Sequence, residues 1–395
     1  MKRRVMSVLL SVTMLGTMLL GGCGVKNQVS EETTGESAAE SMEEESTEAE
    51  SAETESAEVE SAEPDTLKVG LMGTSVKPVG VLVADALGYF TEEGVNIEFE
   101  KVSSMNDAYL AVADGDLDVY LFSSTAAATF ISQGTTTLRV FGGTAAEGSE
   151  IMAKPDCEIT LESAESLRGL RIACQMPETG QMVLKNYLIE QGMTYGGEDE
   201  DADVTFIYVD DGNTAIQGVV NGEFDLCITN SCLGYYADKF GVKVIGGVKD
   251  LVETYPCCRQ TCNQTTYEEH FDALVKFETA AIRGYEYYLN NEEETLDILE
   301  AYSGEDRDFL RGQVYGTDNY TPMMRLSLDP DQNACVDFYE AMGNIGGIDN
   351  SLDIDWASYV VTDVYGTALD ILEERVPDNA LYAELRSYFE ENNTL

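Results

Sequence analysis

The sequence has few basic residues, one histidine and, beyond its N-terminus, no long apolar run. Lys and Arg number 23 against 73 Asp and Glu, which gives a net charge of −50 over 395 residues. Nucleic acids and anionic lipids are bound by clustered Lys and Arg, so this composition argues against both as partners. The single His270 lies in a helical pattern, where a lone histidine is usually a surface or packing residue. Chemistry that needs several histidines is therefore disfavoured.

The N-terminus has the order of features of a secretion signal. A basic run at residues 2–4 precedes an apolar run at residues 5–20, which is short compared with the roughly 20 residues of a membrane helix. The step Leu-Gly-Gly then leads directly into Cys23 and resembles a bacterial lipoprotein cleavage site. We expect residues 1–23 to be a signal peptide with this site and Cys23 to be lipidated. The mature protein would then be anchored to the extracytoplasmic face of the cell membrane.

Residues 24–64 are expected to form an acidic, disordered linker. From Ser30 to Pro64 the chain has fourteen Glu and no basic or aromatic residue. Such a segment buries too little apolar surface to offset the entropy lost on ordering, and its like charges repel. We expect it to hold the folded part away from the membrane.

From Leu67 onwards, short apolar runs alternate with amphipathic stretches. Strands separated by helices of this length indicate a parallel sheet covered on both faces. The pattern starts again near residue 166, and after Cys262 the sequence is helical. We therefore predict an α/β fold of two doubly wound lobes with extra C-terminal helices.

Two segments repeat the same order of features, residues 108–125 and residues 215–232. Each begins with a helix closed by glycine (Gly115, Gly222), continues as a buried strand and ends in a small polar cluster. In open α/β sheets, ligands bind at the carboxyl ends of the strands. The repeat thus predicts two related lobes with a site where these strands end.

The candidate site is a set of small polar residues at predicted strand ends and helix starts. Hydroxyls, an amide and free helix N-terminal N–H groups suit a small polar or anionic group, although Ser, Thr and Asn also cap helices without binding a ligand. Asp210 and Asp211 either accept hydrogen bonds from an amine or form a solvated turn. The set comprises Gly73, Thr74, Ser75, Ser123, Ser124, Thr125, Glu178, Thr179, Gly180, Thr229, Asn230 and Ser231.

The stretch YPCCRQTC, residues 255–262, puts three cysteines and an arginine into eight residues. We expect Cys257 and Cys258 to line the site as small, weakly polar residues, with a Cys258–Cys262 or Cys257–Cys262 disulfide as an alternative state. Arg259 either grips a carboxylate, sulfonate or phosphate or is an exposed or inter-lobe arginine. Neighbouring cysteines rarely hold one zinc ion without further ligands elsewhere, so we expect this stretch to bind no metal. We also expect the protein to have no cofactor.

Four segments, residues 84–100, 111–124, 166–180 and 215–230, together resemble a solute-binding protein of an ABC importer. The chain is similar to the branch that handles aliphatic sulfonates, nitrate, taurine and thiamine pyrimidine precursors. The resemblance runs from about Leu67 to about Asn291 and is looser beyond.

This resemblance implies a periplasmic-binding-protein type II fold that closes around a ligand by hinge motion. Lobe I would be residues 65–145 and 251–395, and lobe II would be residues 146–250. The two crossings between them are expected near Gly142-Gly143 and near Gly246-Gly247.

The resemblance also implies a function. The protein is expected to be a monomeric receptor, not an enzyme, that captures a small polar solute and delivers it to the transmembrane subunits of an ABC permease. Tyr89, Phe122, Tyr235 and Tyr255 either sandwich a planar heterocycle or belong to the core. A thiamine pyrimidine precursor, a sulfonate and a similar small acid therefore all stay open as the solute.

Two other functions are alternatives. Fungal thiamine-pyrimidine synthases carry a cysteine cluster in the corresponding loop, which is linked to iron and to a self-consuming reaction, and PCCRQTC resembles it. That chemistry also needs histidine, whereas His270 follows the loop, and export would separate the protein from its cofactors. A surface adhesin is disfavoured because the sequence has no repeated surface modules.

Overall fold

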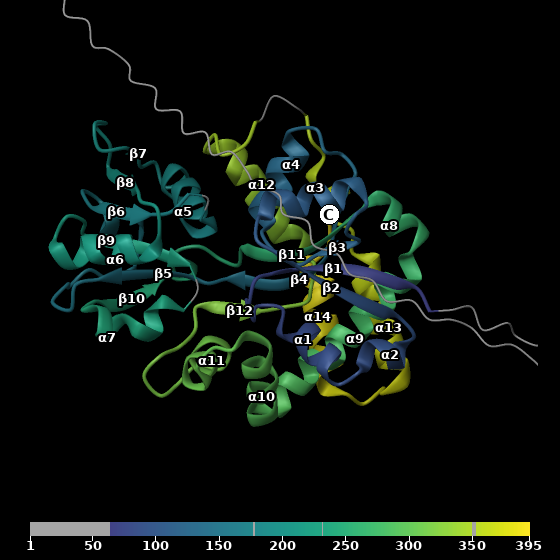
Figure 1. Cartoon of the computed structure of the whole chain (residues 1–395). Helices are drawn as coiled ribbons and strands as arrows, with labels where there is room; N and C mark the ends of the chain where they lie inside the picture. The colour runs from purple at the N-terminus through teal and green to yellow at the C-terminus, as the bar shows by residue number, and fades with distance from the viewer. Residues whose placement is uncertain (1–63, 177, 231, 350–352) are drawn as a thin grey trace, which may run out of the picture. The chain divides into compact units, whose positions relative to one another are not determined.

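Two six-stranded sheets organise the part of the chain that the structure describes (Figure 1). The structure is a computed structural model, and it describes residues 64–176, 178–230, 232–349 and 353–395. The predicted signal peptide, Cys23, the predicted linker as far as residue 63 and the candidate site residue Ser231 lie outside the described residues. No helix within the described ranges combines the length and the apolar character that a membrane span requires.

The first sheet, which belongs to lobe I, mixes parallel and antiparallel pairs. Strand β1 runs parallel to β2 and β3, while β11 is antiparallel to β3 and β4, and β12 is antiparallel to β4. In sheet order the strands are β12 (Met324–Leu326), β4 (Leu138–Glu147), β11 (Pro256–Asn263), β3 (Val119–Tyr120), β1 (Thr66–Met72) and β2 (Asn96–Val102).

The second sheet belongs to lobe II and is also mixed, with four parallel strands and one antiparallel strand between β9 and β10. Strand β6 runs parallel to β8 and β9, β8 is parallel to β7, and β5 is antiparallel to β9 and β10. In sheet order the strands are β10 (Lys243–Gly247), β5 (Ser149–Ala153), β9 (Leu226–Asn230), β6 (Arg171–Cys174), β8 (Val204–Tyr208) and β7 (Tyr195–Gly196).

Helices cover both faces of the lobe I sheet (Figure 1). One face carries α1 (Val79–Ala86), α2 (Tyr89–Glu93), α9 (Phe271–Asn290), α13 (Asp363–Arg375) and α14 (Ala380–Asn392). The other face carries α3 (Met105–Asp114), α4 (Ser124–Ser132) and α12 (Gln332–Asn344). The remaining helices of this lobe are α8 (Gln264–Glu269), which leads into α9, and α10 (Glu292–Ser303) and α11 (Arg307–Val314), which follow it.

Lobe II has fewer helices. They are α5 (Thr179–Glu190), α6 (Gly212–Asn221) and α7 (Ala237–Phe240), with short 3₁₀ turns at Ala164–Leu167, Leu233–Tyr236 and Val248–Asp250. A fourth 3₁₀ turn, Trp356–Tyr359, lies in lobe I. Helices α6 and α7 pack over a small separate core that includes Met152, Ile216 and Val219.

Glycine allows the closest helix contact in lobe I. A Cβ atom on Gly284 of α9 would lie 2.1 Å from the carbonyl oxygen of Gly80 in α1, which no side chain tolerates. The two backbones therefore touch because both positions lack a side chain. This contact fixes α1, and with it the loop between β1 and α1, against the long helix α9.

The predicted α/β fold class is confirmed, with three corrections. The sheets are mixed rather than parallel, because the chain passes from β4 of lobe I into β5 of lobe II and returns from β10 into β11. Strand β11 is antiparallel to β3 and β4, and β5 is antiparallel to β9 and β10. The first crossing lies at Gly148, whose φ is +94°, and not at Gly142-Gly143. Those two glycines lie inside β4, where they pair with Gln260 and Arg259 of β11.

The third correction concerns YPCCRQTC. It is not a loop: residues 256–262 belong to β11 in the interior of the lobe I sheet, and every residue of this strand is buried. The chain leaves the lobe II sheet after Gly247 and enters β11 at Pro256.

Candidate functional site

The carboxyl ends of strands from both lobes come together at one polar interface. Lys77, which follows β1, donates a hydrogen bond from Nζ to Oδ1 of Asn230, the last residue of β9, over 3.2 Å. The hydroxyls of Thr125 in α4 and Thr179 in α5 are 3.2 Å apart. We call Lys77, Thr125, Thr179 and Asn230, together with Cys257, the inter-lobe cluster. Thr125, Thr179, Asn230 and Cys257 are thus sequence candidates that the structure brings together.

Lys77 supplies the positive charge of this cluster. Its ammonium also lies 3.6 Å from Sγ of Cys257. Burial on its own lowers the pKa of Lys77, but the nearby Cys257, Cys258 and Cys232 thiols outweigh it and raise the pKa above its ordinary value. Lys77 therefore stays charged at neutral pH. Lys77 was not among the residues predicted from the sequence, although a basic residue two positions after the candidate segment 73–75 was a usable signal.

Cys257 and Cys258 form a hydrogen-bonded thiol pair, with 3.6 Å between their sulfur atoms. The hydrogen bond from Cys257, together with Lys77, the Ser123 backbone N–H and Arg259, lowers the pKa of Cys258 to about 6 against the opposing effect of burial. The same pairing raises the pKa of Cys257 well above its usual range. The pairing therefore favours the proton on Cys257 and the negative charge on Cys258.

The predicted disulfide alternatives are wrong for this state of the protein. All eight cysteines in the described part of the chain have free thiols. Cys258 and Cys262 are four residues apart in a strand, a separation of about 13 Å at roughly 3.3 Å per residue. A disulfide needs Cα atoms within about 7 Å, so neither Cys258 nor Cys257 can reach Cys262 without breaking the strand.

Arg259 points away from the inter-lobe cluster and into the interior of lobe I. It has no exposed surface, and its Nη1 donates to the carbonyl oxygens of Ala145 and Cys258 over 3.0 and 3.1 Å. Its Nη2 lies 3.5 Å from Oδ2 of Asp331, and its Nε donates to Sγ of Cys335 over 3.4 Å. These contacts occupy the guanidinium fork, so neither the predicted ligand grip nor the alternative of an exposed arginine describes Arg259 in this structure.

Asp329 lies near this buried arginine network and is 2% exposed. Its Oδ1 accepts hydrogen bonds from the Asp331 backbone N–H over 2.7 Å and from Nδ2 of Asn393 over 2.8 Å. Burial raises the pKa of Asp329 from 3.8 to about 6, although the Asn393 hydrogen bond opposes the shift. This carboxyl is therefore a source of pH-dependent stability.

An Asp329→Asn variant is expected to remove that dependence. Because its pKa is raised in the folded state, Asp329 stabilises the fold fully below about pH 4 and loses this contribution as the pH rises through about 6. Asparagine stays neutral at every pH. Between pH 4 and pH 7 the unfolding free energy of the variant should therefore rise by up to about 3 kcal/mol relative to that of the wild type. Urea unfolding across this range measures the difference, with the exposed Asp116→Asn as the control for removing one negative charge. Parallel curves for wild type and Asp329→Asn would contradict the prediction.

Glu178 closes the start of α5 beneath the cluster. It is 3% exposed, and its carboxylate accepts hydrogen bonds from the backbone N–H groups of Gly180 over 3.0 Å and Gln181 over 2.7 Å, and from the Ser149 hydroxyl. Burial raises its pKa. Glu178 and Gly180 therefore build the helix start rather than offering free N–H groups to a ligand.

The other predicted site residues divide into three groups. Ser123 adopts a φ of +54° and caps α4, Ser124 lies 3.0 Å from the Tyr339 hydroxyl, and Thr229 is fully buried. Gly73 and Thr74 are exposed and Ser75 is half-buried, so this loop lies at the rim. Asp211 caps α6 through a 2.8 Å bond from the Thr214 N–H, and its neighbour Asp210 is exposed, as expected for a solvated turn.

The four aromatic candidates do not converge on one place. Tyr89 lies under the Arg283 guanidinium at 4.0 Å from its ring centre, and Phe122 packs against Tyr120. Tyr255 is 2% exposed, and its hydroxyl accepts a hydrogen bond from the Ser149 N–H over 3.4 Å. Tyr235 lines a pocket formed by residues outside the inter-lobe cluster.

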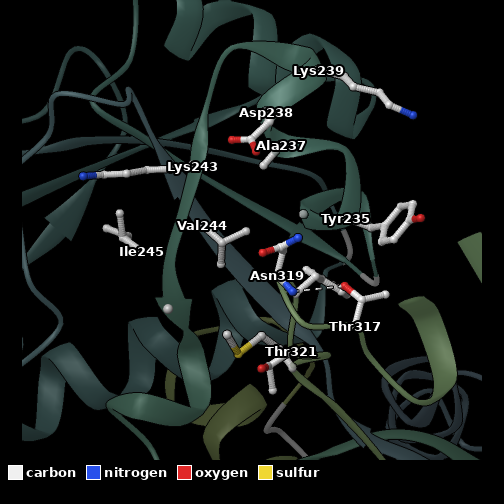
Figure 2. Close-up of a pocket in the computed structure, with 14 residues that line it drawn as sticks. Tyr235, Ala237, Asp238, Lys239, Lys243, Val244, Ile245, Thr317, Asn319 and Thr321 are labelled. Carbon is white, nitrogen blue, oxygen red and sulfur yellow. Dashed lines mark hydrogen bonds between the residues drawn. The ribbon is translucent and has the colours of Figure 1, made fainter. Parts of the chain in front are cut away.

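This pocket has a volume of about 790 Å³, within the range of small-molecule sites (Figure 2). One wall is β10 with the preceding 3₁₀ turn and α7, and the other is the loop around Thr317–Met323 of lobe I. Figure 2 shows Val244 and Asn319 pointing toward one another across it, while Lys239 and Lys243 point away. Most of the lining is neutral polar or apolar, and Asp238, Lys239 and Lys243 are its charged residues.

Tyr320 links this pocket to the lobe II sheet. Its hydroxyl donates to Oε1 of Glu150, a fully buried residue of β5, and Oε2 of Glu150 accepts from the Gly234 N–H over 2.8 Å. Burial raises the pKa of Glu150 against the effect of the Tyr320 bond. The loop of lobe I thus contacts lobe II through Tyr320 as well as through Met323, whose carbonyl oxygen accepts a hydrogen bond from the Gly148 N–H over 3.2 Å.

Comparison with known proteins gives one family and one fold. Residues 76–295 match the family model described as NMT1/THI5 like. No curated protein matches the sequence.

Three solved structures illustrate the fold. The periplasmic sulfonate-binding protein SsuA of Methylobacillus flagellatus KT is 14% identical with a TM-score of 0.61, and the match covers 79% of this chain and 96% of that one. The periplasmic nitrate-binding protein NrtA of Synechocystis PCC 6803 is 14% identical with a TM-score of 0.60, covering 80% and 92%. The desulfurization enzyme DSZB is 15% identical with a TM-score of 0.53, covering 78% and 99%. At these identities the likeness establishes the periplasmic-binding-protein fold and no more.

Proposed function

This chain belongs to the NMT1/THI5-like family, and from that membership we propose that it is a solute receptor of an ABC importer. The observation that carries the proposal is the pair of contacts across the interface, Lys77–Asn230 and Thr125–Thr179. They join strand ends and helix starts of two lobes that the chain links by only two crossings. A solute held there would be enclosed when the lobes close and freed when they part.

The groups at the interface favour a small polar solute with an anionic part. Lys77 provides a charged donor, and the Thr125 and Thr179 hydroxyls add neutral ones. Two buried polar atoms, Oγ1 of Thr229 and Oε1 of Gln181, have no partner among the described residues. Buried polar atoms are normally satisfied, so these two support a bound molecule with hydrogen-bonding groups.

We revise the candidate binding residues accordingly. We propose that the solute contacts Lys77, Thr125, Thr179, Thr229 and Asn230, with Cys257 at the wall. We assign Arg259 to the interior of lobe I, where its partners are Asp331, Cys335 and two carbonyl oxygens.

The lipid anchor, the location and the partners belong to the same proposal. Cys23 would carry the lipid, residues 24–64 would act as the spacer, and the protein would work as a monomer on the extracytoplasmic face beside a permease. The order of basic residues, apolar run, small residues and Cys23 supports this arrangement.

A thermal-shift screen of the full chain in detergent tests the receptor proposal. The solutes to screen are pyrimidine precursors, alkanesulfonates, nitrate, bicarbonate and amino acids. A bound solute at 100 times its dissociation constant should stabilise the folded state by about 2.7 kcal/mol. If no solute stabilises the protein, while iron with pyridoxal phosphate yields a pyrimidine product, the synthase alternative replaces the receptor.

A further inference from the structure

Cys257 and Cys258 have a close sulfur–sulfur contact beside a lysine, which binding of a solute does not by itself require. Other buried cysteines, such as Cys262 on the same strand, lack such a pairing, and burial raises the pKa of Cys262. In contrast, the sulfur atoms of Cys257 and Cys258 are within hydrogen-bonding distance of each other, and the backbone N–H of Ser123, which caps α4, helps to lower the pKa of Cys258. Lys77 completes the setting with its ammonium 3.6 Å from Sγ of Cys257.

Irregular pairing in β11 brings the two sulfurs together. Neighbouring residues of a regular strand point to opposite faces, which would separate Cys257 from Cys258. The register of β11 against β4 shifts between Pro256 and Cys258 and again between Cys258 and Arg259. These shifts allow the two sulfur atoms to lie 3.6 Å apart on the side of Lys77 and Ser123.

We propose that this pair is a modification site, at which a small-molecule disulfide forms a mixed disulfide with Cys258 and the adduct keeps the two lobes from closing. The Cys258 thiolate attacks one sulfur of the incoming disulfide, whose S–S bond breaks as the new S–S bond forms. The departing thiolate takes a proton from water. The incoming disulfide is the oxidant, and a free thiol reverses the step by the same exchange.

The surroundings of the pair support a reactive thiolate. Low-pKa thiols occur beside cations and at helix N-termini, and both are present here. The pKa of Cys258, about 6, leaves this thiol largely ionised at neutral pH. The titratable and charged groups near enough to influence the pair are Lys77, Arg259, Tyr109 of α3, Tyr120 of β3, Glu178 of α5 and Tyr255, and of these Arg259 points to the other side of β11.

Access depends on lobe separation. Cys257 and Cys258 are each 4% exposed, and Lys77 beside them bonds across the interface to Asn230. A reagent reaches the sulfurs only when that contact breaks, and a bulky group on Cys258 then occupies the place that Lys77 fills on closure. The effect on closure rests on the proposed receptor function, whereas the reactivity of the pair does not.

The pH profile of alkylation tests the reactivity. Full chain in detergent is treated with iodoacetamide from pH 5 to 9, and labelled cysteines are identified by mass spectrometry. At pH 6.5 a thiol of pKa about 6 is about three-quarters ionised, against about 1% for an ordinary thiol. We expect labelling of Cys258 to reach half its plateau rate near pH 6 and to exceed that of Cys262 at least 10-fold at pH 6.5. Cys257→Ala should move the midpoint upward.

Glutathione disulfide then tests the effect on closure. We expect a mixed disulfide on Cys258, a larger radius of gyration by small-angle scattering, and reversal of both by dithiothreitol. Cys258→Ser should show neither, and Cys262→Ser should behave as the wild type. Equal labelling of Cys258 and Cys262, or an adduct that leaves the radius unchanged, would overturn the proposal. Neither the alkylation nor the scattering measurement requires a solute. A solute screen without any hit would therefore count against the receptor function and leave the test of Cys258 reactivity unaffected.

Discussion

An Arg259→Met variant is expected to lose about 3 kcal/mol of unfolding free energy. Removing one partner of a buried ion pair costs roughly 3–5 kcal/mol, because the other charge stays buried without compensation. Here Asp331 keeps a second contact with Arg325 over 3.3 Å and accepts a hydrogen bond from Tyr388 over 3.0 Å, so the lower end of that range applies. The carbonyl oxygens of Ala145 and Cys258 also lose their donor.

Urea unfolding of three variants checks this result. Arg168→Met removes an exposed arginine that pairs with Glu165 and Asp203, and such solvent-screened surface pairs contribute little to stability. Adding Asp331→Asn to Arg259→Met should recover part of the loss, because it removes the buried negative charge. A folded, fully stable Arg259→Met protein that no longer binds solute would instead show that Arg259 grips the ligand.

A Lys77→Met variant is expected to bind solute about 10- to 100-fold more weakly. Hydrogen bonds to a charged group contribute roughly 1.5–3 kcal/mol, and 1.4 kcal/mol corresponds to a factor of 10 in affinity. Methionine keeps the apolar stem of Lys77 but removes the ammonium that reaches Asn230 and Cys257. Isothermal titration with the solute that stabilises the wild type most measures the change.

Lys68→Met is the matched control for this experiment. Lys68 is exposed near the start of β1, at the opposite end of the strand from the inter-lobe cluster. Its replacement changes the net charge by the same amount and should leave the affinity within about twofold, because a distant exposed charge is screened by salt. Equal affinities for Lys77→Met and the wild type would remove Lys77 from the site.

Local patterns predicted the sheets and the strand-end interface because these depend on nearby residues. The strands β1, β3, β6 and β9 are short apolar runs in the sequence. In a fold of two such sheets, the residues that follow these strands lie at the interface between the lobes. Thr125, Thr179 and Asn230 were therefore candidates from their positions alone, and the structure places them together.

The surroundings of Arg259 could not be predicted in this way. Its acidic partner Asp331 is 72 residues away along the chain and adopts a φ of +54°, which no local pattern in the sequence signals. The contact between the Cys257 and Cys258 sulfurs could not be predicted from local sequence either. It depends on register shifts in β11, which are set by the pairing of this strand with β4. The prediction of a hinge at Gly142 and Gly143 was wrong because glycine occurs both at flexible crossings and at closely packed positions. These two glycines lie at closely packed positions inside β4.

The bond between Tyr320 and Glu150 bears on how long a bound molecule stays. Parting the two lobes must break this bond as well as the contacts at the cluster, although Tyr320 lies in the loop beside the pocket. A contact that is present only when the lobes are closed lowers the dissociation rate of a ligand more than it changes the association rate. In the proposed receptor, Tyr320 is therefore expected to slow release of the solute, although it lies outside the inter-lobe cluster.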